Sequence, residues 1–590
     1  MIDASFVAQV RASLAEQVQS IAAEAGTDVW AQLQHRRLAE RIKALVAAWR
    51  LDPVAHPGPE LLGWPHVCAP AVIDGGLPPA RLLGHASLLA TQLQRLQGPS
   101  GLFTGGDNVD SPPDSAFSVN DLADTVLMLR HAQSTPGLTA QLTGQLEELL
   151  TAVTPALIAG GVHTPNHRWE LSAALARLHR LWPQPALAER VGQWLAEGVD
   201  IDDSGLYSER SANYAAYVSN PSLLVSGEVF GRADLIDAVE RNLDATLDLL
   251  LPDGSVETVM SRRQDQRFRM QLSAYLLPLR TIARTRKRPD LAWAADLALA
   301  QGLVSPGDAA AHLVLDPDLG LALPTPAEPA RPRRRVFGSA GLLVDHRPAV
   351  TTVVFGGSDY PRQQRIRSGL ANSPTFLRLY AGAAVLDSVR LSRTFFGLGP
   401  FRADGLTVEE DVVTLRETVS AGYYQPLAPA DRDTQGDYRL VDEGRFSAAM
   451  DFGRRARDEI SLTTTVQVRL DDTGAELTVD VTGAVVDWAL ELAFRPGGTM
   501  TGARALGDQR WHLDTGSAEY RIGDDAITVS LLEASDGAGG PMRAAHTAPV
   551  YEPGEEYRFL GGTDAATGEL LYVAGRVPGR VRMKVNVANA

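Results

Sequence analysis

The chain has 590 residues, of which 45% are hydrophobic and 21% charged, and its formal net charge is −16 at pH 7. This length exceeds what one hydrophobic core usually supports, so we expect two or more domains. The acidic balance argues against a general affinity for nucleic acid or for anionic membranes, although a local basic pocket could still bind an acidic ligand.

The number of cysteines and the sequence of the N-terminus indicate the compartment in which the protein works. The one cysteine, Cys68, rules out an intrachain disulfide and a cysteine-rich metal site. The first 26 residues lack the basic stretch and apolar run of a signal peptide. No run of about 18 uncharged apolar residues predicts a membrane span. We therefore expect a cytoplasmic protein, unless a leader has been removed.

The first half of the chain has a helical pattern, because apolar residues recur three and four positions apart up to about residue 320. Loops containing Pro or Gly join the helices without a sharp sequence repeat, which favours an (α/α) toroid of helical hairpins over a solenoid. The expected helices cover residues 5–23, 29–48, 79–96, 120–131, 139–157, 165–181, 186–196, 235–251 and 266–285.

One connection in this half is unusual. Residues 105–120, GGDNVDSPPDSAFSVN, are rich in Asp, Pro and Ser, and they are too many for a plain connector. We expect an exposed loop, which either carries function or is a solvated connection.

The pattern changes in the second half. Residues 323–335 are rich in Pro and Arg and are predicted to form an interdomain linker with solvated arginines. Beyond them side chains alternate as in strands, and Asp472-Thr473-Gly474 predicts a hairpin turn. The expected strands cover residues 341–345, 350–355, 375–380, 460–470, 475–481, 526–532 and 580–587.

These patterns predict a multidomain α+β protein. Residues 1–322 would form an (α/α) toroid that carries the catalytic site, residues 323–335 the linker, and residues 336–590 an antiparallel β-sandwich.

The first polar cluster is GGVHTPNHRWE, at residues 160–170. Thr164 can cap a helix and Pro165 suits its first position, so Asn166 and His167 fall in the first turn. Free N–H groups and the helix dipole favour an anion there. Glu170 lies one turn later on the same face. On these residues alone an ordinary capped helix is the simpler interpretation.

Two further clusters follow, and each comes directly after a turn, so that both could line one end of a toroid. DSGLYSERSANYAAY, at 203–217, carries Arg210 and two tyrosines, Tyr214 and Tyr217, which share a face if the segment is helical. DGSVETVMSRRQDQRFR, at 253–269, carries two adjacent arginines. A tyrosine pair also suits packing, and adjacent arginines suit a solvated surface. The sequence shows no nucleotide-binding or metal-binding motif, so we expect neither a cofactor nor a metal.

The order NHRWE, DSGLYSERSANYAAY, LPDGSVET and SRRQD, followed by a β-rich region, resembles the heparinase II/III-like polysaccharide lyases. That group includes exo-acting oligoalginate lyases. The resemblance covers the architecture of nearly the whole chain, with residue-level support between about 160 and 270. It implies a helical toroid followed by antiparallel sheets with a substrate cleft between them. It also implies β-elimination on a uronic-acid-containing oligosaccharide or polysaccharide, and the absence of a signal peptide fits exo action on imported oligosaccharides.

The resemblance implies roles for single residues. In that family amide, imidazole or guanidinium groups neutralise the uronate carboxylate, so that a Tyr or His can remove the C5 proton, and a Tyr commonly protonates the leaving oxygen. Carried over, the catalytic residues are Asn166, His167 and Tyr214, and the spacing does not separate Tyr214 from Tyr217. The substrate-binding residues are Glu170, Arg210, Tyr217, Arg262 and Arg263.

One segment departs from the family pattern. Family members often present a further histidine early in the β domain. Here Asn372 and Ser373 occupy the corresponding segment, and His346 lies outside the expected motif.

Two other functions remain open. A glycoside hydrolase on the same toroid would use paired carboxylates. Its candidates are Asp107, Asp110, Asp114, Asp121, Asp202 and Asp203. A non-catalytic carbohydrate-binding protein is the third interpretation.

Overall fold

The computed structural model describes residues 1–52, 77–106, 108–132, 137–267, 269–330, 333–546 and 566–587. Cys68 and Asp107 lie outside these ranges. The chain divides into two compact units. Unit 1 comprises Met1–Ser208, Asn213–Leu247 and Gln271–Ala330, and unit 2 comprises Glu209–Ala212, Asp248–Met270 and Arg331–Ala590. Unit 2 thus takes two short segments from the half that the sequence assigns to the toroid.

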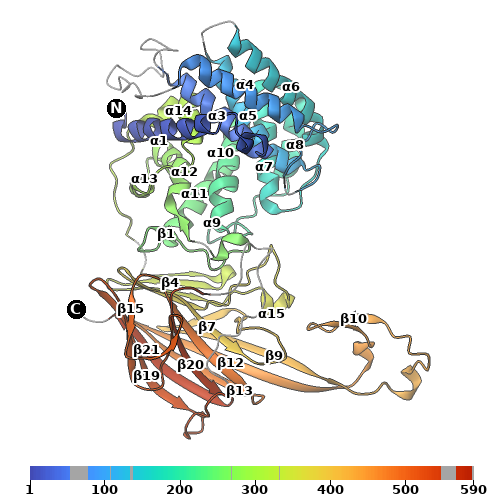
Figure 1. Cartoon of the computed structure of the whole chain (residues 1–590), viewed down its shortest axis with the longest axis vertical. Helices are drawn as coiled ribbons and strands as arrows, with labels where there is room; N and C mark the ends of the chain where they lie inside the picture. Colours follow the sequence, from blue (N-terminus) through green and yellow to red (C-terminus); the bar gives the residue numbers. More distant parts are fainter. Residues whose placement is uncertain are drawn as a thin grey trace. The chain divides into compact units, whose positions relative to one another are not determined.

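Unit 1 is built of helices (Figure 1), and its inner elements form a closed ring, as the toroid prediction requires. Each inner element packs against the next one around the ring, and the last packs against the first. In order these are α3 (His35–Arg50), α5 (Pro112–Arg130), α7 (Pro165–Leu181), α10 (Asn220–Phe230), α12 (Leu276–Arg286), the short 3-10 helix η5 (Pro317–Gly320) and α14 (Pro306–Leu315).

The remaining α-helices of unit 1 supplement this ring. α1 packs against α3 and α14, α4 against α3 and α6, α8 against α7, and α13 against α12. Their bounds, with those of three others, are α1 (Ala4–Ala23), α2 (Asp28–Ala31), α4 (Pro79–Arg95), α6 (Leu138–Ala159), α8 (Pro185–Leu195), α9 (Ala212–Tyr214), α11 (Ala233–Asp248) and α13 (Pro289–Ala300).

The loop predicted at 105–120 is wrong over its second half, because α5 already begins at Pro112. The Ser111 side chain caps this helix by accepting a hydrogen bond from the Asp114 backbone N–H at 3.2 Å. Asp114, Ser115 and Ser118 are buried rather than solvated. Each has a protein partner: Asp114 pairs with Arg36, the Ser115 hydroxyl accepts from the Phe103 N–H, and Ser118 bonds the His35 ring.

Other helix predictions need smaller corrections. The helix predicted at 29–48 is two helices, α2 and α3, separated at Gln32–Gln34. Trp30 on α2 is buried, and its ring N–H donates to the Ile21 carbonyl. The helix predicted at 266–285 is broken by β2 (Met270–Gln271), and its helical parts are the end of the 3-10 turn η3 (Gln264–Arg267), the 3-10 turn η4 (Leu272–Tyr275) and α12. The sequence prediction missed α10, α13 and α14.

Unit 2 contains two large sheets. One has nine strands in the order β16-β17-β20-β14-β7-β6-β5-β4-β3, and the other has eight in the order β15-β18-β19-β21-β13-β12-β9-β8. Every pairing is antiparallel except that of β17 with β20. The two sheets share one apolar core, which includes Leu391 and Leu490 from the first sheet and Val466 and Val581 from the second. The predicted antiparallel β-sandwich is therefore confirmed.

The strand predictions agree well with the structure, and the hairpin of β12 with β13 pairs Asp471 with Gly474 at its turn. β3 begins at Arg334, inside the segment predicted as linker, and Arg334 forms an ion pair with Asp345. The strands are β3 (Arg334–Phe337), β4 (Leu342–His346), β5 (Thr351–Phe355), β6 (Leu377–Ala381), β7 (Ala384–Arg393), β8 (Leu406–Glu409), β9 (Val412–Tyr424), β12 (Arg457–Asp471), β13 (Gly474–Gly483), β14 (Asp487–Phe494), β15 (Thr499–Thr501), β16 (Arg504–Gly507), β17 (Arg510–His512), β18 (Ser517–Ile522), β19 (Asp525–Ser535), β20 (Glu569–Arg576) and β21 (Gly579–Val587).

A glycine contact near β4 gives a stability prediction. A Cβ added to Gly357 would lie 1.8 Å from the Ala340 carbonyl oxygen, whereas a Cβ on nearby Gly338 would meet nothing within 4 Å. Gly357→Ala should therefore lower the free energy of unfolding of unit 2 by roughly 1–3 kcal/mol, because the backbone must move apart. Gly338→Ala is the matched control and should leave it nearly unchanged. Equal effects in denaturant unfolding would contradict this contact.

Candidate functional site

The first turn of α7 contains the amide and imidazole predicted to bind an anion. The helix begins at Pro165 with Thr164 as N-cap, as predicted, but the Thr164 side chain makes no capping hydrogen bond. Instead the Thr164 backbone carbonyl accepts from the His167 N–H at 3.2 Å, and its hydroxyl oxygen lies 3.4 Å from the Asn166 amide. Asn166 and His167 are 1% and 7% exposed. Burial at the positive end of a 17-residue helix gives both groups fixed positions.

The second cluster approaches α7 at two places. The turn η2 (Ala215–Ser219), which carries Tyr217 and directly follows Tyr214, packs against α7. Asp200, which precedes the cluster, accepts a hydrogen bond from the Trp169 ring N–H at 3.0 Å and pairs with Arg168 at 3.1 Å. Within unit 1 the structure therefore brings together the helix that starts with Pro165 and the turn that holds Tyr217.

The two tyrosines lie on different kinds of turn. Tyr214 ends the short helix α9, and Tyr217 belongs to η2 (Ala215–Ser219), which is a π-helical turn. A π turn, with its i→i+5 hydrogen bonds, winds less per residue than an α turn, so side chains three apart diverge further than predicted. Tyr217 is 41% exposed and lines the cavity described below, and Tyr214 is not among the residues that line it.

Glu170 belongs to a buried polar network that joins α5 to α7. Its carboxylate accepts a hydrogen bond from the Asn120 side-chain amide at 2.6 Å. The oxygen of the Asn120 side-chain amide in turn accepts a hydrogen bond from Arg177 at 3.1 Å. Arg177 also forms an ion pair with Asp124 at 2.9 Å. Burial raises the pKa of Glu170 to about 7, although the Asn120 hydrogen bond and the Arg177 charge oppose this shift.

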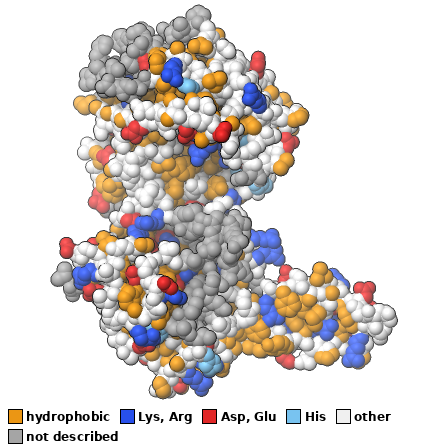
Figure 2. Space-filling view, viewed as in Figure 1, with side chains coloured by type: hydrophobic (Ala, Val, Ile, Leu, Met, Phe, Trp, Pro, Cys, Tyr) orange, Lys and Arg blue, Asp and Glu red, His pale blue; other side chains and the backbone are white. Residues whose placement is uncertain are grey.

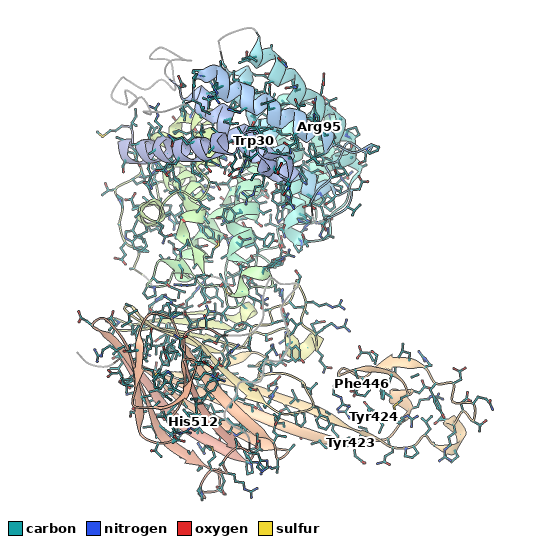
Figure 3. The ribbon with its side chains drawn as sticks, in the orientation of Figure 1. Trp30, Arg95, Tyr423, Tyr424, Phe446 and His512 are labelled. Carbon is teal, nitrogen blue, oxygen red and sulfur yellow. The ribbon has the colours of Figure 1, made fainter. Side chains whose placement is uncertain are left out.

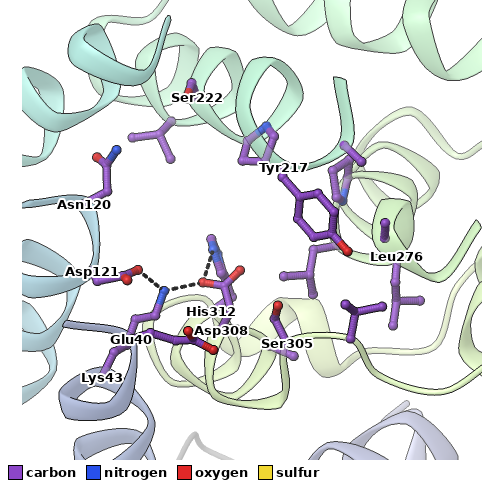
Figure 4. A pocket seen from close by; sticks show the side chains of 18 of the residues that line it. Glu40, Lys43, Asn120, Asp121, Tyr217, Ser222, Leu276, Ser305, Asp308 and His312 are labelled. Carbon is purple, nitrogen blue, oxygen red and sulfur yellow. Dashed lines mark hydrogen bonds and ion pairs between the residues drawn. The ribbon is translucent and has the colours of Figure 1, made fainter. Parts of the chain in front are cut away.

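A cavity of about 580 Å³ lies within unit 1 (Figure 4), and Glu170 and Tyr217 are the predicted site residues among its lining. Part of the lining is apolar, from Leu224 and Leu276 among others, and part is charged. Carboxylates outnumber permanently charged cations in this lining. The acids are Glu40, Asp121, Glu170, Glu228, Asp308 and Asp316, and the cations are Arg36, Arg37, Lys43 and Arg177.

Lys43 is the centre of the charged part of the cavity. Its ammonium group pairs with Asp121 and, at 2.5 Å, with Asp308, which joins α3 to α5 and α14 (Figure 4). Burial opposes the charge on Lys43, but the two carboxylates outweigh it and raise its pKa. Burial raises the pKa of Asp121 to about 6 in spite of Lys43, whereas Lys43 holds the pKa of Asp308 below its usual range.

The three predicted arginines lie in unit 2 and have partners there. Arg262 makes a bidentate ion pair with Asp359, at 2.9 and 3.0 Å. Arg263 lies 3.3 Å from the Glu209 carboxylate. Arg210, whose backbone is left-handed with φ of 50°, donates to the Ser339 carbonyl oxygen at 2.5 Å.

The segment in which the sequence resemblance implies a further histidine is bonded to the same arginine-bearing loop. The Asn372 N–H donates to the Gln266 side chain at 3.0 Å, and the Asn372 carbonyl accepts from Arg402 at 2.7 Å. The Ala371 N–H donates to Asp359, the partner of Arg262. Asn372 is fully buried, so this position is built into the loop packing of unit 2.

Sequence reasoning missed several residues of the cavity, notably Lys43, Asn120, Arg177 and Asp308. A signal for two of them was present: Lys43 and Arg177 are the one charged residue in each of the runs 42–48 and 171–178, which are otherwise nearly all apolar, and a charge in such a run is retained only if it is paired. Among the hydrolase candidates that the structure describes, only Asp121 lines the cavity. Asp114 pairs with Arg36, Asp202 closes the turn before Leu206, Asp110 bonds Ser100, and Asp203 is exposed.

Comparison with known proteins gives similarity only at the level of solved structures. No protein-family model and no curated protein matches the chain. Crystallised heparinase III is 11% identical, with 86% of this chain and 74% of that chain covered and a TM-score of 0.48. Heparan sulfate lyase HepC from Pedobacter heparinus is 10% identical (93% and 76% covered, TM-score 0.43). A mutant chondroitin AC lyase from Streptomyces coelicolor A3 is 14% identical (98% and 78%, 0.44). At these values no residue role is taken from them.

The described part of the chain lacks two further features. None of its helices has the length and apolar character needed to cross a bilayer. In the same ranges, no three His, Cys, Asp or Glu side chains cluster in a way that could hold a metal ion.

The raised pKa of Glu170 predicts a pH-dependent stability difference. A carboxyl whose pKa rises from 4.5 to about 7 on folding stabilises the fold fully only below 4.5, and this contribution is lost as the pH rises through 7. The Glu170→Gln variant keeps the shape of the side chain but cannot carry the negative charge. Relative to wild type, the variant should gain up to about 3 kcal/mol in free energy of unfolding between pH 5 and pH 8. Urea unfolding at both pH values measures this, and a constant difference would contradict the buried carboxyl.

Proposed function

We propose that the protein is a polysaccharide lyase that cleaves a uronic-acid-containing glycan by β-elimination. One observation supports this most: the first turn of α7 buries an amide and an imidazole, Asn166 and His167, in a helix that packs against η2, the turn that directly follows Tyr214. Hydrogen-bond donors held in place at the positive end of a helix suit a carboxylate, and they suit still better the charge that develops on it during proton removal.

The proposed reaction uses these groups in two steps. Asn166 and His167 donate to the uronate carboxylate and so acidify the proton on C5. His167 or Tyr214 removes that proton, the C5 electron pair forms a C4–C5 double bond, and the bond from C4 to its glycosidic oxygen breaks. Tyr214 protonates the leaving oxygen, so that no water is consumed.

The charge of the cavity supports a uronate site at the start of α7 rather than inside the ring. Six carboxylates line the cavity against four permanently charged cations, and Lys43 is already paired with Asp121 and Asp308, so a further carboxylate would meet net repulsion. The first turn of α7 offers donors instead.

Arg210, Arg262 and Arg263 remain candidates for binding acid groups of the glycan. Each is already held by a protein oxygen, which would orient the guanidinium group before substrate arrives. Exo action on oligosaccharides also remains a proposal. Release of one unsaturated product size from the start of the reaction would support it, and a ladder of sizes would contradict it.

A second candidate function, glycoside hydrolysis, is favoured by the cavity itself. Asp121 and Glu170 line it with pKa values of about 6 and 7, which suits a carboxyl that must donate a proton near neutral pH. In that case the cavity, and not the start of α7, would hold the reacting sugar.

Product absorbance separates the two functions. Glucuronan, alginate, heparinoid and plant-gum oligosaccharides are incubated with the protein while near-ultraviolet absorbance is followed, because only elimination creates an absorbing double bond. We expect a rise on at least one uronate. Release of reducing sugar without any rise would establish hydrolysis and refute the lyase, and Asp121→Asn would then be expected to abolish turnover.

The two tyrosines provide a matched pair of variants. Tyr214→Phe should lower kcat by roughly 10²–10⁴-fold, because it removes the proposed proton donor and keeps the ring. Tyr217→Phe should leave kcat within about tenfold, since the Tyr217 hydroxyl is assigned only a binding role. Calorimetric measurement of oligosaccharide binding to the Tyr214→Phe variant is the control, because a variant that still binds has kept its fold. The reverse order of effects would move the catalytic role to Tyr217.

A further inference from the structure

A folded arm extends from the eight-stranded sheet of unit 2. It comprises residues 421–460, where the paired ends of β9 and β12 continue beyond the sheet (Figure 1). The arm has its own small core: Phe452 is buried, and the rings of Tyr424 and Phe446 lie 4.6 and 5.7 Å from it. The Tyr424 hydroxyl donates to Glu443 at 2.9 Å. These contacts give the arm a defined shape (Figure 3).

The arm nevertheless exposes large apolar side chains. Tyr423 is 64% exposed, Leu440 71% and Phe446 45%. Hydrophobic side chains are visible over the arm in Figure 2. Exposed apolar groups on an ordered projection are typical of a contact surface.

The arm carries a separate two-stranded sheet of β10 (Leu440–Asp442) and β11 (Ser447–Ala449). Among the strands that the structure describes, β11 pairs with β10 alone, so its other edge is open. The three residues of β11 are small and uncharged, and thus lack the charges or proline that usually protect an edge.

The hydrogen-bond alternation of the hairpin shows which groups face the open edge. The Glu443 N–H donates to the Phe446 carbonyl at 3.1 Å, and the register pairs Val441 with Ala448. Since bonded and non-bonded pairs alternate in an antiparallel ladder, Ala448 directs its backbone groups toward β10. Ser447 and Ala449 therefore direct theirs outward, and both residues are exposed.

The sequence around β11 is complementary to itself in an antiparallel arrangement centred on Ala448. Ser447 then lies opposite Ala449 of the other copy, and both present outward-facing N–H and C=O groups. Phe446 lies opposite Met450, so that alternate side chains form an apolar strip. The match ends there, because Asp451 is buried, has a left-handed backbone and pairs with Arg454.

We propose that β11 is a self-association edge, through which two copies of the chain pair β11 with β11 across a two-fold axis at Ala448. The product is a four-stranded antiparallel sheet with an isologous interface. A strand from a different protein could also pair with the open edge, but that pairing would not require the palindromic order of Phe446, Ala448 and Met450. The order therefore favours a second copy of this chain as the partner. The proposal does not depend on the proposed lyase activity.

A cross-linking experiment tests the axis directly. Cα atoms of opposed residues in a non-bonded antiparallel pair lie about 4.5 Å apart, within the range that a disulfide spans. Cys68 is first replaced by Ser, because it is the chain's one cysteine. Ala448→Cys in that background should oxidise largely to a covalent dimer on a non-reducing gel. Ala430→Cys, an exposed alanine on the same arm, is the matched control and should stay monomeric. Equal cross-linking of the two would overturn the proposal.

Sedimentation of the full chain gives an independent test. Wild type should dimerise as its concentration rises, and Ala449→Pro should weaken the dimer by roughly tenfold or more, because it removes an outward N–H from each copy. An unchanged far-ultraviolet circular dichroism spectrum shows that the variant still folds. A wild type that stays monomeric at every concentration would overturn the proposal, as would a dimer that Ala449→Pro leaves intact.

Discussion

The helical ring depends on charged groups that are satisfied across helices. Lys43 joins α3 to Asp121 on α5 and Asp308 on α14, and Arg177 joins α7 to Asp124 on α5. Arg177 and Asp124 are both buried, and breaking such a pair by removing one partner typically costs about 3–5 kcal/mol, because the other charge is left uncompensated. These helices are therefore constrained both by apolar packing and by electrostatics, and few other arrangements would satisfy every charge.

This constraint reaches the proposed catalytic residues through α7. Glu170 and Arg177 fix two positions along the helix through Asn120, and the Trp169 ring fixes a third through Asp200. A helix held in this way has little freedom to shift its first turn. Asn166 and His167 are consequently held ready before any ligand arrives, which is what transition-state stabilisation by fixed donors requires.

Local signals in the sequence predicted much of the fold, and the failures have physical causes. α7 was predicted to the residue because Thr164 and Pro165 mark its start. The predicted start of α5 lies too far along the chain, because the Asp and Ser residues of its first turns were interpreted as an exposed loop. The Ser111-Pro112 cap was the better signal of where the helix begins. The inclusion of residues 248–270 in unit 2 could not be predicted, since it depends on long-range pairs such as that of Glu257 with Arg378. The cavity could not be predicted for the same reason, since its charged groups come from separate helices.

The most direct test of the account is a crystal structure of the Tyr214→Phe variant with a uronate oligosaccharide bound. The account predicts that a uronate carboxylate lies at the first turn of α7, within hydrogen-bond distance of the Asn166 amide. An oligosaccharide bound instead in the cavity beside Lys43 and Asp121, with no carboxylate near Asn166, would contradict it.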